Sequence, residues 1–274
     1  MEWPDYELLD FGQEARLERF GEVVLNREES SAYQSPSLAD ENWDKAHATY
    51  REHQGWNSHQ DIPESWNIQF REITLGLKLS QNNKHIGIFP EQADQWRWLM
   101  EQKPQTTSPP KLLNLFGHTG AGSLAACLSG YEVTHVDASK PAINQGKENQ
   151  RLSNLMEKRI RWIHEDAITW VERELKRKST YHAILLDPPT FGRGPKGQIW
   201  KNDRDLPKLL KKLLGILDPK EAQFVVLNHY TAANPSFPKA SLPNQIISGD
   251  HKLISSAGDT LNLAKWFRMD FGKT

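Results

Sequence analysis

Five short apolar segments recur between residues 112 and 228, and they restrict the chain to few folds. They are LLNLF (112–116), YEVTHVD (131–137), RIRWIHED (159–166), HAILLD (182–187) and FVVLN (224–228). Apolar runs of this length are typical of strands that are buried on both faces, as in a parallel sheet. We therefore expect these segments to be neighbouring strands of one sheet.

Helical patterns separate the apolar segments. Ser139 is expected to cap a helix with Pro141 in its first turn, and Asp166 to open another helix. Six leucines then follow helical spacing and form one apolar stripe that must lie on a sheet: Leu206, Leu209, Leu210, Leu213, Leu214 and Leu217. Strands and helices in alternation predict a doubly wound α/β domain.

The first part of the chain has a different pattern. Residues 6–12, 16–28 and 66–80 are β-leaning runs broken by glycine, which predicts a small antiparallel module. Pro90 is expected to begin a helix that reaches Gln102, and KPQTTSPP (103–110) predicts a linker. The expected division is a β-rich module (1–80), a connecting helix and linker (81–110) and the α/β domain (111–274).

Charge divides the 274 residues unevenly. Residues 1–105 carry 10 Lys and Arg against 19 Asp and Glu (net −9), and residues 106–274 carry 24 against 16 (net +8). The basic part faces either a polyanion or the acidic part, or it only carries solvated lysines on its helices.

A single cysteine excludes a disulfide scaffold and a thiolate-bound zinc or iron–sulfur site. With no long apolar run and no signal-peptide pattern, we expect a cytoplasmic protein without membrane or metal partners.

The first strand runs into a glycine-rich turn, LLNLFGHTGAGS (112–123). Gly117, Gly120 and Gly122 permit the close backbone approach that a nucleotide-like ligand needs at a helix N-terminus, although a tight turn without a ligand fits them too. Asp137 follows the next strand, where a carboxylate can accept both ribose hydroxyls. Asp166 is expected either to bind an adenine amino group or to cap its helix.

The strand at 182–187 ends in Asp-Pro-Pro-Thr-Phe. Two prolines fix the backbone and remove two N–H donors, so the Asp187 carboxylate and the Pro188 carbonyl can point outward as acceptors beside the flat face of Phe191. This arrangement suits a planar base with an exocyclic amine. A merely rigid loop is the alternative.

Taken together, LLNLFGHTGAGS (112–123), VDASKPAINQGKEN (136–149) and LLDPPTFGRG (185–194) resemble successive motifs of class I S-adenosylmethionine-dependent methyltransferases. They are similar, more narrowly, to the catalytic domains of large-subunit ribosomal RNA methyltransferases, and KHIGIFPEQ (84–92) resembles the segment before the glycine motif in that group. The likeness covers about residues 80–270. It implies a Rossmann-like, doubly wound, mostly parallel seven-stranded sheet, preceded here by the small β-rich N-terminal module. His118 departs from the usual tyrosine, and Pro90, Glu91 and Ala93 depart from the upstream pattern.

The resemblance also implies roles for particular residues. The cofactor S-adenosyl-L-methionine would be bound by Phe89, Gln92, Phe116, Gly117, Thr119, Gly120, Gly122, Asp137, Asp166 and Asp187. Asp187, Pro188 and Phe191 would form the catalytic site. Independently of the resemblance, the basic and aromatic residues of the loop that follows predict substrate binding through Phe191, Arg193, Lys196, Trp200 and Lys201, with phosphate contacts and stacking planes.

Methyl transfer requires alignment of a nucleophile with the sulfonium methyl rather than an activated side chain. Attack by cytosine C5 requires a cysteine adduct, and the lone Cys127 lies in a helix, where it is expected to be a buried packing residue. We therefore expect methylation of a nitrogen on an RNA base, ribosomal RNA first. The alternatives are a protein or small-molecule methyltransferase, a non-catalytic nucleic-acid-binding protein and an NAD-dependent oxidoreductase. His229 and Tyr230 either face this site or pack in the core.

Overall fold

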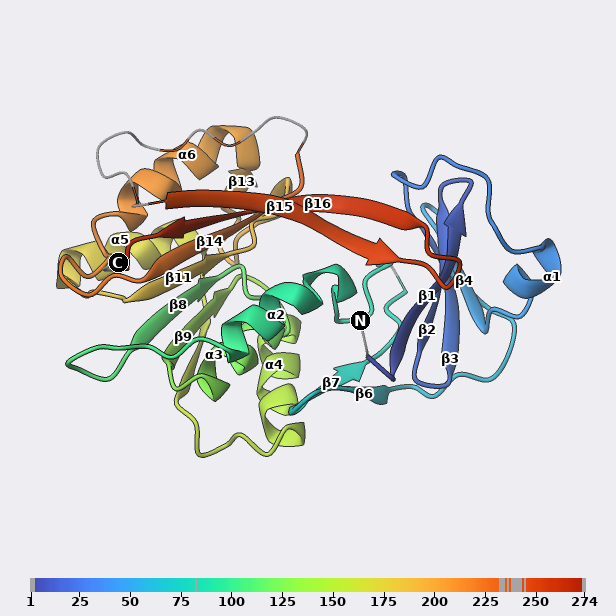
Figure 1. Cartoon of the computed structure of the whole chain (residues 1–274), viewed down its shortest axis with the longest axis horizontal. Helices are drawn as coiled ribbons and strands as arrows, with labels where there is room; N and C mark the ends of the chain where they lie inside the picture. The colour runs from blue at the N-terminus through green and yellow to red at the C-terminus, as the bar shows by residue number, and fades with distance from the viewer. Residues whose placement is uncertain are drawn as a thin grey trace. The chain divides into compact units, whose positions relative to one another are not determined.

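The computed structural model describes residues 3–81, 83–231, 235, 237, 243 and 245–272. By internal contacts the chain forms two compact units (Figure 1). Unit 1 comprises residues 1–93 and 251–263, and unit 2 comprises residues 94–250 and 264–274. No helix among the described residues is both long and apolar enough to cross a membrane.

Unit 1 is built around a five-stranded sheet. Its order is β1 (Tyr6–Gly12), β2 (Ala15–Phe20), β3 (Val23–Glu28), β4 (Ala48–Arg51) and β5 (Gly55–Ser58), and only the β3–β4 pair is parallel. Strands β6 (Trp66–Phe70) and β7 (Ile73–Leu77) form a separate hairpin, α1 (Asp40–Trp43) is one turn long, and the 3-10 helix η1 spans Pro90–Gln92. The predicted β-rich module is confirmed.

A small apolar core in unit 1 joins distant parts of the sequence. Leu8 and Phe11 from β1 pack with Ala32 and with Leu253 and Leu261 from near the C-terminus. The last two belong to β15 (Gln245–Ile254) and β16 (Thr260–Asp270), whose remaining residues lie in unit 2. The sequence analysis divides the chain at residues 80 and 110 and does not assign residues 251–263 to the first module. That division into domains stays a prediction.

Unit 2 contains the predicted seven-stranded sheet. Its order is β10 (Ile160–His164), β9 (Glu132–Asp137), β8 (Lys111–Leu115), β11 (Ala183–Leu186), β14 (Phe224–His229), β16 and β15. The first five strands are parallel, and β16 pairs antiparallel with β14. All five apolar segments are therefore neighbouring strands, as expected.

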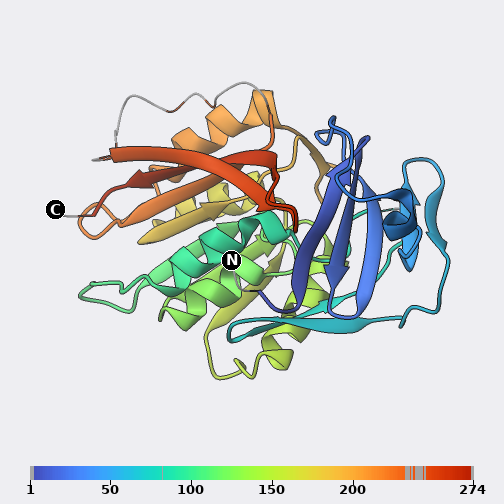
Figure 2. The same cartoon turned by 45° about the vertical axis from the view of Figure 1, so that its right-hand side comes forward.

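Helices cover both faces of this sheet (Figures 1 and 2). They are α2 (Ala93–Met100), α3 (Ala121–Leu128), α4 (Lys140–Leu152), α5 (Ala167–Arg177) and α6 (Asn202–Leu213). Helices α5 and α6 pack on one face in a single apolar cluster with side chains of β8, β11 and β14, and α3 and α4 contact β8, β9 and β10 on the other face. This is the doubly wound arrangement that the alternating pattern predicted.

Two helices differ in extent from the prediction. The segment expected to form one helix over 90–102 is divided into η1 and α2. Helix α6 ends at Leu213, so the leucine stripe extends beyond the helix. The leucines that are buried within the helix are Leu206, Leu209, Leu210 and Leu213. Leu217 is also buried, but it follows the helix and forms a β-bridge to Tyr181. Leu217 fits helical spacing only by coincidence.

Candidate cofactor and substrate site

The glycine-rich turn after β8 has an unusual backbone. Phe116 and His118 have φ values of 57° and 50°, and Gly120, which precedes α3, has a φ of 89°. Left-handed conformations of residues other than glycine cost about 1–2 kcal/mol each, so this turn is held by its surroundings. Backbone bonds hold it: Gly120 N–H donates to the Gly117 carbonyl (3.0 Å), and Gly117 N–H donates to the Val136 carbonyl (3.3 Å).

The three glycines of the turn differ in how strictly their positions require glycine. A Cβ atom on Gly117 would collide with the His135 ring, and one on Gly120 would lie 2.6 Å from Cη2 of Trp162. At Gly122 the nearest atom would be 3.5 Å away, which is an ordinary contact. Packing thus requires glycine at 117 and 120, and leaves room for a methyl group at 122.

A buried polar network lies beneath the turn. Asn114 on β8 donates to the Ser123 hydroxyl (2.9 Å), and this hydroxyl also bonds Nδ1 of His135 on β9 (2.9 Å). Burial lowers the pKa of His135 to about 3, so the ring is neutral at physiological pH. The sequence analysis missed this network, although the register pairs Asn114 with His135 and a lone Asn within the apolar run LLNLF was a usable signal.

Asp137, at the end of β9, is anchored by the main chain on either side. Its Oδ2 accepts from the N–H of His118 (2.8 Å), and its Oδ1 accepts from the N–H of Ser139 (2.7 Å). Ser139 caps α4 as predicted, since its hydroxyl accepts from Ala142 N–H. Because the first of these bonds joins the glycine turn to the end of β9, the two motifs form one structure.

Asp166 is the N-cap of α5. Its Oδ1 accepts from both the N–H and the hydroxyl of Thr169, at 2.8 and 2.9 Å. The capping alternative for this residue is therefore confirmed, and adenine binding stays a prediction. The preceding Glu165 is buried; burial opposes its ionisation, but the Asp166 N–H, Arg173 and Lys196 together hold its pKa below the ordinary value.

Asp187 follows β11, the neighbour of β8 on the side opposite β9. Its N–H donates to the Leu115 carbonyl (3.2 Å), which places the start of the Asp-Pro-Pro turn beside the start of the glycine turn. The His118 imidazole lies within the electrostatic reach of both carboxylates: burial lowers its pKa, while Asp137 and Asp187 act in the opposite direction. Asp137 and Asp187 thus belong to the same edge of the sheet, on either side of the glycine turn.

The segment after the proline pair forms a hairpin of two short strands, β12 (Phe191–Arg193) and β13 (Ile199–Lys201). Phe191 pairs with Lys201 and Gly192 with Trp200, so Phe191 and Trp200 lie on opposite faces of this hairpin. Phe191 is 52% exposed and Trp200 only 4%. Phe191 is therefore accessible to a ligand, as the sequence analysis expected.

Trp200 has a role different from the predicted one. Its ring packs on Phe116 with centroids 4.9 Å apart, and its Nε1 donates to the Pro189 carbonyl (2.7 Å). A buried ring cannot offer a face to a base, so the expectation that Trp200 stacks on substrate is corrected to a structural role. It fastens the Asp-Pro-Pro turn to the glycine turn, and it also places the side chain of Phe116 against the core.

The other predicted substrate contacts come from the exposed parts of this hairpin. Arg193, Lys196 and Lys201 are all exposed. Lys196 lies 3.9 Å from the Glu165 carboxylate, which follows β10. Lys196 therefore lies near the end of β10, while contact of the three cations with a substrate stays a prediction.

Several further candidates have a packing role or lie elsewhere. Cys127 is 1% exposed and its thiol donates to the Leu124 carbonyl, and burial raises its pKa to about 12. It is the packing residue that was expected. His229 is buried at the end of β14 and bonds the Thr231 hydroxyl (2.8 Å). The packing alternative therefore describes His229.

Phe89 and Gln92 belong to unit 1, at the start and the end of η1. Gln92 is buried, and Phe89 packs on the His85 ring with centroids 4.8 Å apart. Glu91, which precedes Gln92 in η1, is buried too; burial raises its pKa, and Arg16 of β2 partly opposes that effect. The predicted place of Phe89 and Gln92 beside the cofactor stays a prediction.

Comparison with known proteins agrees with this geometry. A model of the S-adenosylmethionine-dependent methyltransferase family matches residues 45–241. A crystal structure of a SAM-dependent methyltransferase from Agrobacterium tumefaciens is 34% identical to the chain with a TM-score of 0.88, and the match covers 98% of this chain and 91% of that one. The structure of SMU.776, titled as complexed with SAH, is 19% identical with a TM-score of 0.76, covering 98% of this chain and 76% of that one, and it supports the fold alone.

Curated relatives match only in part. Ribosomal RNA large subunit methyltransferase K/L of Shewanella frigidimarina is 34% identical over 110 residues, which is 39% of this chain and 15% of the relative. The same-named protein of Pseudoalteromonas translucida is 32% identical over 135 residues, 48% of this chain and 18% of the relative. The chain thus matches less than a fifth of the length of these relatives. The family model and the Agrobacterium structure nevertheless match most of the chain, which therefore belongs to the S-adenosylmethionine-dependent methyltransferase family.

Proposed function

We propose that this methyltransferase transfers the methyl group of S-adenosylmethionine to a nitrogen of an RNA base, with ribosomal RNA as the first substrate to test. The observation that carries the proposal is the meeting of two acidic strand ends at one turn. His118 N–H bonds Asp137 and Asp187 N–H bonds the carbonyl of Leu115, so carboxylates from β9 and β11 flank the glycine turn of β8. In doubly wound sheets, ligands bind at this carboxyl edge.

The residues at this edge fit the cofactor. A carboxylate has about four acceptor positions, and Asp137 uses one on each oxygen, which leaves acceptors for two ribose hydroxyls. The turn at Phe116, Gly117, Thr119, Gly120 and Gly122 would border the amino-acid moiety. Asp166 would bind the adenine amino group with the carboxylate oxygen that does not cap α5. Phe89 and Gln92 stay further candidates for cofactor contact on the basis of the sequence motif alone.

Bound at this edge, the cofactor supplies a methyl group on a sulfonium, which a nucleophile takes by in-line displacement. The protein's task is to hold the nucleophile about 3 Å from the methyl carbon and in line with the bond that breaks. Asp187 and the Pro188 carbonyl would accept hydrogen bonds from an exocyclic amine and so fix its orientation. Phe191, half exposed beside them, would stack on the base.

A nitrogen acceptor fits the structure better than cytosine C5. Methylation at C5 needs a thiolate that adds to the base. Cys127 is the one cysteine of the chain, and its thiol is buried in α3 with a pKa raised to about 12. The chain therefore has no thiolate to supply for such an adduct.

The RNA substrate is supported by charge and by relatives. Arg193 and Lys201 lie on the exposed hairpin that carries Phe191, where they would contact phosphates. The curated relatives bear the name of large-subunit ribosomal RNA methyltransferases. A cytoplasmic location, with RNA as the partner, goes with this substrate.

The test compares bulk RNA from a strain that lacks the gene with RNA from its parent. Purified protein and labelled S-adenosylmethionine should methylate only the first, because the parental sites are already occupied. The Asp187→Ala variant, which removes the acceptor without touching Asp137, should lose at least about tenfold in rate, as expected for a lost charge-assisted hydrogen bond. Equal labelling of the two RNA pools would refute an RNA substrate, and mass spectrometry of the nucleosides would identify the methylated atom.

A further inference from the structure

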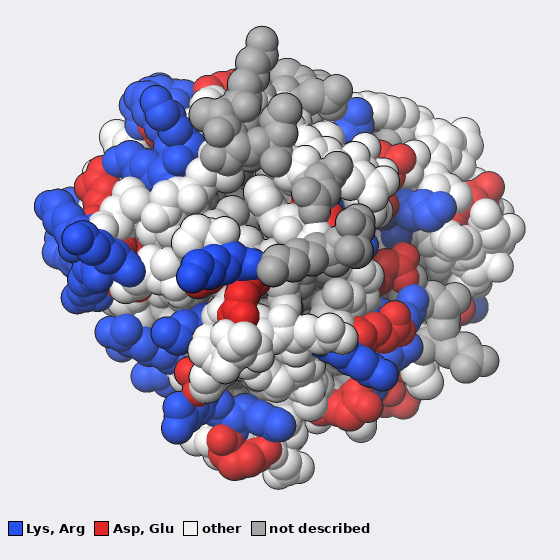
Figure 3. Space-filling model, turned by 60° about the vertical axis from the view of Figure 1, so that its left-hand side comes forward, with Lys and Arg blue, Asp and Glu red and all other residues white. Residues whose placement is uncertain are grey.

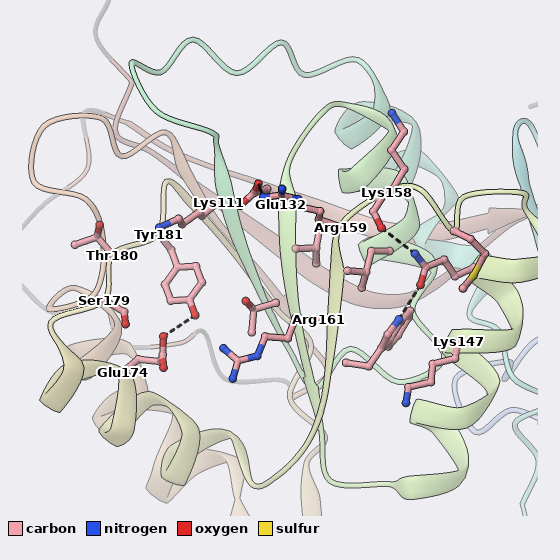
Figure 4. Close-up of a pocket in the computed structure, with 16 residues that line it drawn as sticks. Lys111, Glu132, Lys147, Lys158, Arg159, Arg161, Glu174, Ser179, Thr180 and Tyr181 are labelled. Atoms are coloured by element: carbon pink, nitrogen blue, oxygen red, sulfur yellow. Dashed lines mark hydrogen bonds and ion pairs between the residues drawn. The ribbon is translucent and has the colours of Figure 1, made fainter.

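The opposite edge of the same sheet holds a cavity that the proposed chemistry does not use. It measures about 720 Å³ and is lined by the beginnings of β8, β9 and β10, by the segment that precedes β11 and by residues of α4 and α5 (Figure 4). Strands β8, β9 and β10 begin at this cavity and end at the cofactor edge. A strand of five residues, such as β8, spans about 16 Å, which separates this cavity from the glycine turn.

The cavity is basic. Its lining includes five cationic and two anionic residues, for a net charge of +3: Lys111, Lys147, Lys158, Arg159 and Arg161 against Glu132 and Glu174. Both acids are already engaged. Glu132 accepts from Arg159 (2.6 Å), and Glu174 accepts from the Tyr181 hydroxyl (2.8 Å) and from Arg177 (2.9 Å).

The remaining cations have no acidic partner among the described residues. No ion pair joins Lys111, Lys147 or Arg161 to a carboxylate in the part of the chain that the structure describes, and all three are exposed. The Arg161 guanidinium lies 5.1 Å from the Trp170 ring, which orients it without neutralising its charge. These cations are thus free to pair with an external anion.

The cations are spread along the cavity. In Figure 4, Arg161 of β10 points toward the Glu174–Tyr181 pair, whereas Lys147 extends from α4 on the other side of β10. Figure 3 turns the side of the molecule where β8 begins toward the viewer, and Lys and Arg side chains gather along that face. Helix α5 reaches the cavity with its C-terminal end, since Glu174 is in its last turns, so no helix N-terminus contributes.

This arrangement suits a linear polyanion better than a single phosphate. A single phosphate is bound by donors that converge on one point, most often at a helix N-terminus. Separate cations along a groove match charges that repeat along a chain, and the hydroxyl of Ser179 on its wall can donate to a phosphate oxygen. The sugar–phosphate backbone of a nucleic acid has this form.

We propose that the amino-terminal edge of the sheet in unit 2 binds the RNA backbone at a distance from the methylated nucleotide. The groove is defined by Lys111, Lys147, Lys158, Arg159 and Arg161. This inference rests on the proposed RNA substrate. It adds a second contact region, which fixes how the substrate lies on the enzyme without touching the reacting atoms.

The test is a double charge reversal, Lys111→Glu with Lys147→Glu. Both side chains are exposed, so the fold should be unaffected. Binding of a fluorescent single-stranded RNA is measured by anisotropy at several salt concentrations. We expect the dissociation constant at low salt to rise at least about tenfold. The negative slope of log K (the association constant) against log salt should become shallower by about 1.4, for two lost phosphate contacts. Affinity for S-adenosylmethionine should not change.

A matched variant controls for net charge. Lys45→Glu with Lys211→Glu makes the same change at exposed lysines outside the groove and should alter RNA affinity less than about twofold. If the two double variants weaken RNA binding equally, or if neither weakens it, the proposal that this groove binds RNA is wrong. The proposal is also wrong if inorganic phosphate displaces the fluorescent RNA as well as unlabelled RNA of equal phosphate content does. If the wild type methylates RNA while the groove variant binds it normally, only this inference fails; if the wild type neither binds nor methylates RNA, the proposed function fails with it.

Discussion

The two edges of the sheet in unit 2 use polar residues in different ways. At the carboxyl edge, side chains and main chain bond one another: Asp137 accepts two backbone N–H groups, and Asp166 caps a helix. At the amino edge, Lys111, Lys147 and Arg161 are exposed and have no acidic partner among the described residues. Hydrogen bonds therefore hold the polar groups of the first edge in place, whereas the two lysines of the second offer charge without a bonded partner among the described residues.

This difference follows from what each ligand requires. A methyl transfer fails when the reacting atoms shift by about an ångström, so the groups that position the cofactor must be held by the fold. Binding of a phosphate backbone depends on charge and tolerates mobile lysine side chains. The left-handed turn at Phe116, His118 and Gly120 shows how much local strain the fold accepts at the first edge. Substitutions that remove single contacts at this edge can test whether it is held more firmly than the amino edge.

The largest change in stability is expected on removal of the Trp200 ring, which contacts both the glycine turn and the Asp-Pro-Pro turn. Trp200→Ala should lower the free energy of unfolding by about 3–5 kcal/mol, because it removes a buried ring that packs on Phe116 and bonds Pro189. Phe191→Ala, on the opposite face of the hairpin, should change it by less than about 0.5 kcal/mol and should slow methyl transfer. Urea unfolding of both variants is the measurement. If Trp200→Ala is as stable as the wild type, Trp200 does not hold the motifs together.

Two glycines of the same turn provide a matched pair. Gly120→Ala should cost about 2–4 kcal/mol, because φ is 89° and the new methyl group would lie 2.6 Å from Trp162. Gly122→Ala should be within about 0.5 kcal/mol of the wild type, since its methyl group has ordinary contacts. Thermal unfolding compares the two. Equal loss in both would mean that the turn is not constrained at Gly120 in particular.

The buried His135 predicts a dependence of stability on pH. Its pKa is about 3 in the folded protein and about 6.5 when unfolded, so the unfolded chain binds an extra proton below pH 6.5. The stability that the neutral ring contributes is complete above pH 6.5 and is lost as the pH falls toward 3. Between pH 7 and pH 5 the loss is about 2 kcal/mol.

This loss is measured by urea unfolding at the two pH values. His135→Asn should reduce the difference between them by about 2 kcal/mol, whatever its effect on stability at pH 7. The same difference in variant and wild type would show that other groups cause it.

The smallest effect concerns the cap of α5. Asp166→Ala should cost about 1 kcal/mol, whereas Asp166→Asn keeps an acceptor for Thr169 N–H and should cost a few tenths. Affinity for S-adenosylmethionine separates the two roles of this carboxylate. If Asp166→Asn is stable but binds the cofactor more weakly, then Asp166 also contacts the adenine; unchanged affinity would leave it with the cap alone.

The sequence predicted the five parallel strands of unit 2 well because each of them has a local signature, whereas β15 and β16 were not identified from any local pattern. An apolar run such as FVVLN is buried on both faces, and Ser139 with Pro141 defines a helix start without any tertiary information. The leucine stripe succeeded for the same reason up to Leu213. It failed at Leu217, because helical spacing does not reveal where a helix ends.

Other features depend on partners that are remote in the sequence. The burial of a tryptophan in a polar loop depends on residues far away in the sequence. The local pattern around Trp200 therefore predicts substrate contact, whereas the ring packs on Phe116. Strands β4 and β5 are short and polar and become strands only by pairing with β3 and with each other. Residues 251–263 join the core of unit 1 through Leu253 and Leu261. No pattern within the C-terminal segment predicts this contact.

Titration calorimetry with S-adenosylmethionine tests the central claim, that the cofactor binds at the carboxyl edge and not at the amino edge. Asp137→Ala removes the carboxylate next to the glycine turn and should weaken binding about 100-fold, the equivalent of two hydrogen bonds to a charged group. The amino-edge variant Lys111→Glu with Lys147→Glu should bind the cofactor as tightly as the wild type. Normal binding by Asp137→Ala together with loss of binding in the amino-edge variant would contradict the account.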